Sequence, residues 1–518
     1  MTMGQRIAAW LLPFGLAVAA PLTPSLAAPA ARPACNVAAM QTIAPAGTEI
    51  AFANRGAGRK PSCTIYGHVT TRDPGPNRIA FELTLPGQSN GRFLYIGIGG
   101  AGGYLPAIPA KLVDKGYAIA GSDKGTDAAS IQDFSFMADP AKALDYDHRA
   151  LHVTAQATQQ IAKAYYGATL HRYMTGCSGG GHMAMNNARF YAAQDFDGII
   201  AGACPMFTEA YLANIGRITQ YIQKHPEGWI SPELLERAEK AIIAAYDMTD
   251  GARDGIIHDD RNIKSFDLGI LRNTGFTPAQ IATFEVMHQP YRYNGTRVPP
   301  GGTVSGYPIN TVSHWSYFVM GSKPPPWKNS AQAPVEEIVA SGAPFLYVLS
   351  DTMIRGKLGA NVDYVNGLDF SKSADLIRLE GPPAEHQPFD FGAFAKAGGK
   401  MIFYQGVADE SVPYTEMINE FAAMEKQFPD LASWARLYAI PGLMHCTGGL
   451  GPDDAPDQLL EAMADWVEKG TPPQAPVATR MGAAKTILLC PEPKRARLKS
   501  PGADPSKAEN WVCEMPAT

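Results

Sequence analysis

A serine set between glycines is the feature that most limits how this chain can fold. Gly176-Cys177-Ser178-Gly179-Gly180 has the pattern G-x-S-x-G. A short strand-like run, 172–175, precedes it, and a helix-like segment from about 181 to 191 follows it. Glycines permit a tight turn, and a serine between a strand and a helix is typical of a nucleophile elbow. The pattern therefore predicts a strand-turn-helix unit that presents the Ser178 hydroxyl to an open site.

A histidine-cysteine pair far downstream, His445-Cys446, complements the serine motif. A disulfide between Cys177 and Cys446 would hold Ser178 and His445 close together. A serine hydroxyl is a poor nucleophile until a base accepts its proton and a carboxylate orients that base. The two motifs together therefore favour a hydrolase in which His445 is the base.

Asp409 is the candidate for the orienting carboxylate. It follows the strand-like run 400–404, and His445 follows the next such run, 435–440. In α/β-hydrolases the chain order is serine, acid, histidine, and open α/β sheets carry their sites beyond strand ends. Taken singly, Asp409 reads as a turn-capping carboxylate and His445 as a loop histidine. With the elbow, they predict the triad Ser178, Asp409 and His445.

Two backbone N–H groups are expected to form an oxyanion hole. One belongs to Gly179, the residue after the nucleophile, and the other to the glycine-rich stretch 97–103. Within that stretch we favour Gly100, with Gly99 next; a merely flexible loop is the alternative. A phosphate-binding loop is disfavoured, because no Lys-Ser or Lys-Thr follows the glycines.

The alternation of strand-like and helix-like segments predicts an α/β protein. Between about 35 and 205, short apolar runs such as 93–97 alternate with helical segments such as 150–166. This order is typical of a mostly parallel sheet covered by helices.

A change of pattern in the middle of the chain predicts a second domain. Residues 206–395 lose the alternation and contain long Pro/Gly-rich loops, after which the alternation resumes. We expect an α/β-hydrolase catalytic domain made of residues 29–205 and 396–518, with residues 206–395 inserted as a lid. The 518 residues are 46% hydrophobic, enough for a large core. The net charge of −5 offers no electrostatic reason to expect nucleic acid or an anionic membrane as a partner.

The N-terminus predicts a secretory signal peptide over residues 1–28. Arg6 is followed by the apolar run 7–20 and then by small residues suited to cleavage after about Ala27 or Ala30. An uncleaved membrane anchor is disfavoured, because the run is short and contains Pro13. The mature protein is expected to be secreted or periplasmic, without a membrane partner.

Export makes the seven cysteines readable as disulfides. Proximity in the sequence suggests the local pairs Cys35–Cys63 and Cys490–Cys513, which leaves Cys177–Cys446 as a long-range pair. Cys204 is then odd, and it ends an apolar strand, so we expect a buried free thiol. Zinc is disfavoured, because no C-x-x-C spacing occurs.

At these residues the chain resembles the tannase and feruloyl esterase family. The likeness lies in Gly176-Cys177-Ser178, in 147–152, in 398–409 and in 441–446, and it runs from about 35 to 513. It implies an α/β-hydrolase that hydrolyses esters of aromatic acids, of the hydroxycinnamic or gallic type. Mono(2-hydroxyethyl) terephthalate hydrolases look like relatives too, so a terephthalate monoester or another non-phenolic ester is the alternative. A non-catalytic, calcium-stabilised binding protein is a third reading, which the complete triad disfavours.

The resemblance also implies a structural calcium ion in the lid. Asp247, Asp250 and Asp254 lie on a glycine-containing loop, and carboxylate oxygens suit this hard cation. The backbone carbonyls of Ala252 and Ile256 would complete the shell. From the spacing alone, a solvated acidic turn is as good an interpretation. The ion is expected to hold the lid and to take no part in the chemistry.

This chain departs from the family pattern at several positions. His182 stands where the family commonly has arginine, and Asp123-Lys124-Gly125-Thr126 replaces an Asp-Thr-Gly-His segment. Tyr246 replaces a cysteine, so the lid lacks its usual disulfides. We interpret His182 as a residue on a helix face. The lid aromatics suit either an aromatic acyl group or plain core packing; they are Trp315, Tyr317, Phe318 and Trp327.

Overall fold

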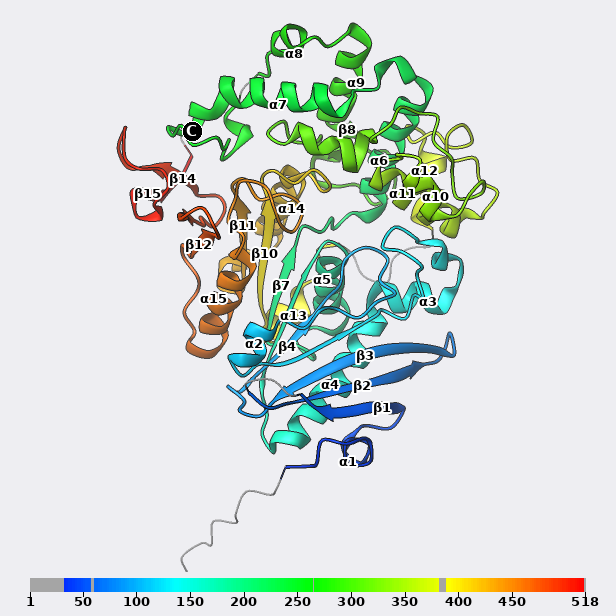
Figure 1. Ribbon diagram of the computed structural model, residues 1–518, viewed down its shortest axis with the longest axis vertical. Helices are drawn as coiled ribbons and strands as arrows, with labels where there is room; N and C mark the ends of the chain where they lie inside the picture. The colour runs from blue at the N-terminus through cyan, green and yellow to red at the C-terminus, as the bar shows by residue number, and fades with distance from the viewer. Residues whose placement is uncertain (1–31, 57–59, 264, 382–387, 517–518) are drawn as a thin grey trace, which may run out of the picture.

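The computed structural model (Figure 1) describes residues 32–56, 60–263, 265–381 and 388–516. Its centre is a nine-stranded sheet in the order β1-β2-β3-β5-β4-β6-β7-β10-β11. Neighbouring strands are parallel from β5 to β11, whereas β1, β2, β3 and β5 pair in antiparallel fashion. The predicted mostly parallel sheet is confirmed, and an antiparallel meander extends it at the N-terminal edge.

The strands of this sheet are β1 (Thr48–Arg55), β2 (Ser62–Thr71), β3 (Asn77–Pro86), β4 (Arg92–Ile96), β5 (Ala118–Ser122), β6 (His171–Cys177), β7 (Gly198–Gly202), β10 (Lys400–Gly406) and β11 (Ala435–Ile440). Four helices pack against this sheet: α4 (Ala150–Tyr166), α5 (Gly179–Tyr191), α14 (Tyr414–Gln427) and α15 (Ala455–Lys469).

Helices cover both faces of the sheet, because the parallel strands are apolar on both sides. Met174 and Ile199 belong to the core cluster that includes α4, α5 and α14. Their chain neighbours Tyr173 and Ile200 belong to the opposite cluster, which α15 covers. Successive side chains of a strand point to opposite faces, so single-residue alternation assigns each side chain to one core.

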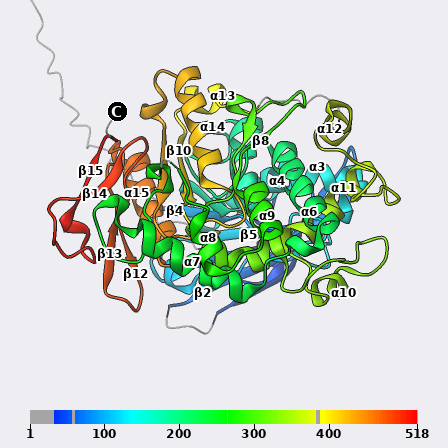
Figure 2. The same ribbon diagram turned by 90° about the horizontal axis from the view of Figure 1, so that it is seen from above.

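Within the described residues, the segment between β7 and β10 adds no strand to the large sheet. It forms α6 (Thr208–Lys224), α7 (Pro232–Tyr246), α8 (Gly269–Thr274), α9 (Pro278–His288), α10 (Val335–Ala340), α11 (Phe345–Leu358), α12 (Ser373–Glu380) and α13 (Gly392–Lys396), with a small ladder of β8 (Tyr291–Arg292) and β9 (Thr303–Val304). Most of these helices lie across one end of the sheet (Figures 1 and 2). The predicted domain limits themselves stay a prediction.

The three predicted disulfides are confirmed. Cys35–Cys63, Cys177–Cys446 and Cys490–Cys513 have Cα–Cα distances of 5.7, 5.8 and 5.5 Å. Cys204 is buried and unpaired, as expected, and burial raises the pKa of its thiol. The last disulfide joins two C-terminal hairpins, β12 (Val477–Arg480) with β13 (Lys485–Leu488) and β14 (Arg495–Leu498) with β15 (Trp511–Glu514).

The predicted signal peptide lies outside the described residues. In the part of the chain that the structure describes, no helix is both long enough and apolar enough to span a bilayer.

Candidate active site

Ser178 occupies the turn between β6 and α5, as the elbow pattern predicts. Its backbone has φ 57° and ψ −123°, a conformation that a residue with a Cβ seldom adopts. Such strain persists only where the surrounding structure enforces it, and it gathers at functional sites. The turn places Ser178 at the wall of a cavity.

The glycines around Ser178 are required because backbone segments approach one another closely. A Cβ on Gly176 would lie 2.3 Å from the Gly180 carbonyl oxygen, and one on Gly181 would lie 2.2 Å from the Gly202 oxygen. A Cβ on Gly180 would lie 2.6 Å from the Gly97 oxygen. These contacts hold the elbow against β7 and against the glycine-rich stretch after β4.

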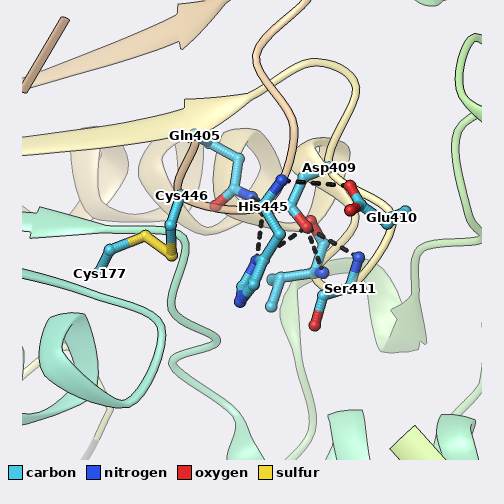
Figure 3. The surroundings of a disulfide bond; sticks show 8 residues. Cys177, Gln405, Asp409, Glu410, Ser411, His445 and Cys446 are labelled. Atoms are coloured by element: carbon cyan, nitrogen blue, oxygen red, sulfur yellow. Dashed lines mark hydrogen bonds and ion pairs between the residues drawn. A yellow bond between two sulfur atoms is a disulfide. The ribbon is translucent and has the colours of Figure 1, made fainter. Parts of the chain in front are cut away.

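His445 and Asp409 form a close pair (Figure 3). The His445 Nδ1 atom lies 2.9 and 3.0 Å from the two carboxylate oxygens of Asp409, which is fully buried. The carboxylate also accepts hydrogen bonds from the Gln405 side chain at 2.7 Å and from the backbone N–H groups of Ser411 and Val412 at 2.9 and 2.7 Å. These three donors hold the Asp409 carboxylate in place, facing the imidazole ring.

The Asp409 carboxylate sets the basicity of His445. Burial of the ring opposes its protonation, but attraction to Asp409 outweighs burial and raises the pKa of His445. Glu410 lies on the other side, where it accepts the backbone N–H of His445 at 3.1 Å. Burial and the nearby Asp409 charge raise the pKa of Glu410 to about 7.

The Cys177–Cys446 disulfide brings the serine and the histidine to the same place, since each cysteine is the chain neighbour of one of them. Among the described residues, the Ser178 hydroxyl makes no hydrogen bond to the His445 ring. In free enzymes this hydrogen bond is often long and shortens when substrate binds. The structure therefore brings the three predicted triad residues together, with the Asp409–His445 link already made.

The predicted oxyanion-hole residues lie beside Ser178. Gly100 and Gly179 both line the cavity, and within the described chain neither backbone N–H donates to a protein acceptor. Gly100 has φ 55°, and a Cβ there would lie 2.4 Å from the Ile131 carbonyl oxygen, so the position requires glycine. Two free donors next to a serine are what a developing oxyanion requires.

The cavity beside Ser178 has a volume of about 540 Å³. Aromatic side chains line much of it, namely Phe134, Tyr146, Phe190, Phe207, Tyr211 and Phe345. Its polar groups include Asp147, His182, Arg189, Glu209, Arg297, Lys357 and Glu380. Sequence reasoning did not identify these rings, because they come from five separate places in the chain and share no motif. His182, interpreted as a residue on a helix face, is part of this wall and stacks on Tyr146.

The four aromatic residues singled out in the lid have different surroundings. Trp315 and Trp327 are buried in the packing of the lid. Tyr317 is 57% exposed. Phe318 places its ring edge-on to His445, with 5.8 Å between ring centroids. Only Phe318 therefore lies beside the candidate triad.

The acidic loop predicted to bind calcium is held by contacts of its own. Asp247 accepts the Gly255 N–H at 3.0 Å, and Asp250 accepts the Ala252 N–H at 2.9 Å. Asp254 lies 2.8 Å from the Lys485 ammonium. Within the described ranges, no group of three or more His, Cys, Asp or Glu side chains is placed to hold a metal ion. The donor types suit calcium, but this arrangement does not form its shell, so calcium stays a prediction.

Several known proteins are similar to this chain in sequence or in fold. A probable feruloyl esterase of Arthroderma benhamiae is 28% identical over 489 residues, which cover 88% of this chain and 87% of that protein. The crystal structure of feruloyl esterase B from Aspergillus oryzae has a TM-score of 0.73 at 21% identity, covering 92% of this chain and 98% of that one. Tannin acyl hydrolase from Aspergillus niger has a TM-score of 0.65 at 18% identity, and the match covers 93% of this chain and 96% of that one.

The fold and the site together define a carboxylic ester hydrolase of the α/β-hydrolase class. The family model described as tannase and feruloyl esterase matches residues 63–513, and the chain belongs to this family.

Proposed function

We propose that this protein hydrolyses esters of aromatic acids, of the hydroxycinnamic or gallic type, through an acyl-enzyme on Ser178. The observation that carries the proposal is the position of Ser178 at the wall of an aromatic-lined cavity of about 540 Å³. Rings such as Phe190 and Phe345 would bury and stack on a planar acyl group. The names of the relatives, feruloyl esterase and tannin acyl hydrolase, support the same substrate class.

Acylation begins when the Ser178 oxygen attacks the ester carbonyl and His445 accepts the hydroxyl proton. The carbonyl oxygen becomes an oxyanion, which the N–H groups of Gly179 and Gly100 stabilise. His445 then gives its proton to the leaving alcohol. Asp409 holds the Nδ1–H tautomer and stabilises the imidazolium that forms.

Deacylation repeats these steps with water. His445 deprotonates the water as its oxygen attacks the acyl-enzyme, and the same two N–H groups stabilise the second oxyanion. When this tetrahedral intermediate collapses, His445 returns the proton to the Ser178 oxygen and the acid is released. One ester and one water therefore yield one acid and one alcohol.

A terephthalate monoester is a second candidate substrate, because basic side chains line the same cavity. Arg189, Arg297 and Lys357 would attract a second carboxylate on the acyl ring. Glu209 lies 2.8 Å from Lys357 and 3.4 Å from Arg297 and offsets part of that charge. This internal neutralisation is why we place the uncharged phenolic acids first.

The test is an initial-rate measurement on methyl ferulate, methyl gallate, a terephthalate monoester and a p-nitrophenyl alkanoate, with Ser178→Ala as the control. We expect turnover of one or both phenolic esters and a loss of several orders of magnitude in the variant. Turnover of the terephthalate monoester alone would move the substrate to the second candidate. No turnover together with no fluorophosphonate labelling of Ser178 would leave a non-catalytic binding protein.

A structural calcium ion in the loop Asp247–Ile256 is a further proposal. The three carboxylates of the loop and the predicted carbonyls of Ala252 and Ile256 support it. Binding would require Asp254 to exchange the Lys485 ammonium for the metal. Titration calorimetry on chelator-treated protein should show calcium binding that Asp250→Asn abolishes. A titration of the wild-type protein with calcium that shows no heat of binding would refute the proposal.

Export is also proposed. Three disulfides favour an oxidising compartment, and the N-terminal pattern of the sequence supports a signal peptide. Expression of the full chain in a Gram-negative host, followed by fractionation and N-terminal sequencing, should yield a processed protein outside the cytoplasm. An unprocessed cytoplasmic protein would contradict it.

A further inference from the structure

A lysine lies behind the two glycines of the oxyanion hole. Lys124 has no exposed surface, and its Nζ atom is 3.2 Å from the carbonyl oxygen of Gly100 and 3.2 Å from that of Gly179. The ammonium also lies 4.5 Å from the centroid of the Tyr146 ring, a cation–π contact. One side chain therefore joins the two glycines that line the cavity beside Ser178.

This placement is unfavourable for folding in two ways. Lys124 pairs with no carboxylate among the described residues, and burial alone lowers the pKa of its ammonium to about 7. Its backbone has φ 67°, a left-handed conformation that a lysine seldom adopts. Buried unpaired charges and strained residues gather at functional sites, because selection for folding alone would remove them.

The groups that face the lysine leave its charge uncompensated. Tyr146 is neutral, because burial raises the pKa of its hydroxyl. The next ring, His182, is neutral too, because burial, and then the Lys124 charge, lower its pKa to about 3. Asp147 lies beyond this ring, 3.7 Å from His182 Nε2. Asp123 directs its carboxylate to the N–H groups of Ala80 and Gly125.

We propose that Lys124 is a positioning residue for the oxyanion hole. By donating to the carbonyl oxygens of both Gly100 and Gly179, the ammonium ties the two residues together and so restrains the separation of their N–H donors. Its positive charge, buried next to both glycines, also favours the negative charge that develops on the substrate oxygen. The inference rests on the proposed ester-hydrolase function of Ser178.

The test compares Lys124→Met with wild type and with Lys142→Met. Methionine keeps the length of the side chain and removes its charge and donors. Lys142 is the matched control, since it pairs with Asp127 and touches neither glycine. For each protein we would measure kcat, KM, their dependence on pH from 5 to 9, and Tm at pH 6.

In Lys124→Met we expect kcat to fall by about tenfold to a hundredfold, with KM changed less than threefold, because a weakened oxyanion hole acts in the transition state. In the wild type, kcat should decline as pH rises through about 7, where Lys124 loses its charge. This decline should be missing from Lys124→Met. The Tm of the variant should equal or exceed that of the wild type, because a buried charge is removed.

Unchanged kcat and an unchanged pH profile in Lys124→Met would overturn the proposal. So would a loss of activity that merely follows a lower Tm, because a structural lysine predicts that outcome. If Lys124→Met does not fold, Lys124→Gln keeps a donor without the charge. A Lys124→Gln variant that retains the wild-type decline above pH 7 would overturn the proposal equally.

Failure of the proposed function is distinguishable from failure of this inference. Phosphonylation of Ser178 by a fluorophosphonate also develops negative charge in the oxyanion hole, and it needs no natural ester. If no ester in the panel is hydrolysed, Lys124→Met should still label more slowly than wild type and than Lys142→Met. Equal labelling rates would overturn the role of Lys124, whichever substrate the enzyme uses.

Discussion

Cys177 and Cys446 form a disulfide that joins the residue before Ser178 to the residue after His445, across a sequence separation of 269. The bond connects the turn after β6 to the loop after β11, two strands that are not neighbours in the sheet. It therefore restrains the distance between the candidate nucleophile and its base directly, and not only through the packing of the core.

The double variant Cys177→Ala/Cys446→Ala should lose both stability and activity. A loop of this length restricts the unfolded chain by an amount worth on the order of 5 kcal/mol in the chain-entropy model. We also expect kcat to fall at least about tenfold, because a small displacement of the base slows proton transfer. Tm and initial rates on the same preparation measure both effects.

The matched control for this bond is Cys35→Ala/Cys63→Ala, which removes a disulfide of separation 28 far from Ser178 in the fold. That variant should lower Tm and leave kcat unchanged. Wild-type kcat in the Cys177/Cys446 variant would show that the core alone positions His445.

Activity should decline in acid, because His445 must be neutral to accept the Ser178 proton. Asp409 raises the pKa of His445, so kcat/KM should fall as pH drops through a value above the ordinary one of histidine. In Asp409→Asn the pH at which kcat/KM falls in acid should be lower than in the wild type. The rate should also drop by about 10³- to 10⁴-fold, less than in Ser178→Ala. If the acid decline of kcat/KM stays at the same pH in Asp409→Asn, Asp409 is excluded as the partner of His445.

Glu410 should make the protein less stable as pH rises. Its pKa is raised to about 7 in the folded state, above its unfolded value, so the folded protein holds a proton that the unfolded chain has released. Stability from this group is therefore complete in acid and lost as pH rises through about 7. Glu410→Gln, whose amide oxygen still accepts the His445 N–H, should raise the free energy of unfolding at pH 8 by on the order of 2 kcal/mol.

Urea titrations at pH 8 and pH 4.5 measure this effect. The two proteins should differ at pH 8 and nearly agree at pH 4.5, where the carboxyl group is protonated in the folded protein and about half protonated in the unfolded chain. An equal difference at both values would mean that Glu410 acts through packing and not through ionisation.

Gly176→Ala should destabilise the elbow through a steric clash. The new Cβ would lie 2.3 Å from the carbonyl oxygen of Gly180 and 2.4 Å from its carbonyl carbon, and these are backbone atoms that cannot turn away as a side chain could. We expect the free energy of unfolding to fall by about 3 kcal/mol or more, together with loss of activity.

Gly91→Ala is the control, because its Cβ meets nothing within 4 Å and only its φ of 83° opposes alanine. This variant should lower the free energy of unfolding by about 1 kcal/mol. Chemical denaturation of both variants decides the comparison, and equal losses would show that crowding at the elbow is not the cause.

The local elements and the candidate triad were predictable from the sequence. Strand-like runs predicted β4, β6, β10 and β11, and helix-like segments predicted α4 and α5. The serine motif, the chain order of acid and histidine, and the cysteine beside each motif predicted Ser178, Asp409 and His445. These features are local or covalent, so short stretches of sequence carry them.

The surroundings of the site depended on the tertiary structure. The rings of the cavity come from segments around 134, 146, 190, 207 and 345, which no motif connects. Lys124 reads in the sequence as an ordinary loop lysine, and only folding buries it between Gly100 and Gly179. The ammonium of Lys485 beside Asp254 was equally invisible in the spacing of the acidic loop.

The sequence by itself therefore determined the candidate nucleophile, its candidate partners in the chain and the three disulfides, because the elbow pattern is local and a disulfide is a covalent link between two cysteines. Only the tertiary structure decided which rings line the cavity beside Ser178, that Lys124 is buried and that Asp254 pairs with Lys485. Burial and electrostatic environment arise from residues that are distant in the chain, and no local pattern of residues specifies them.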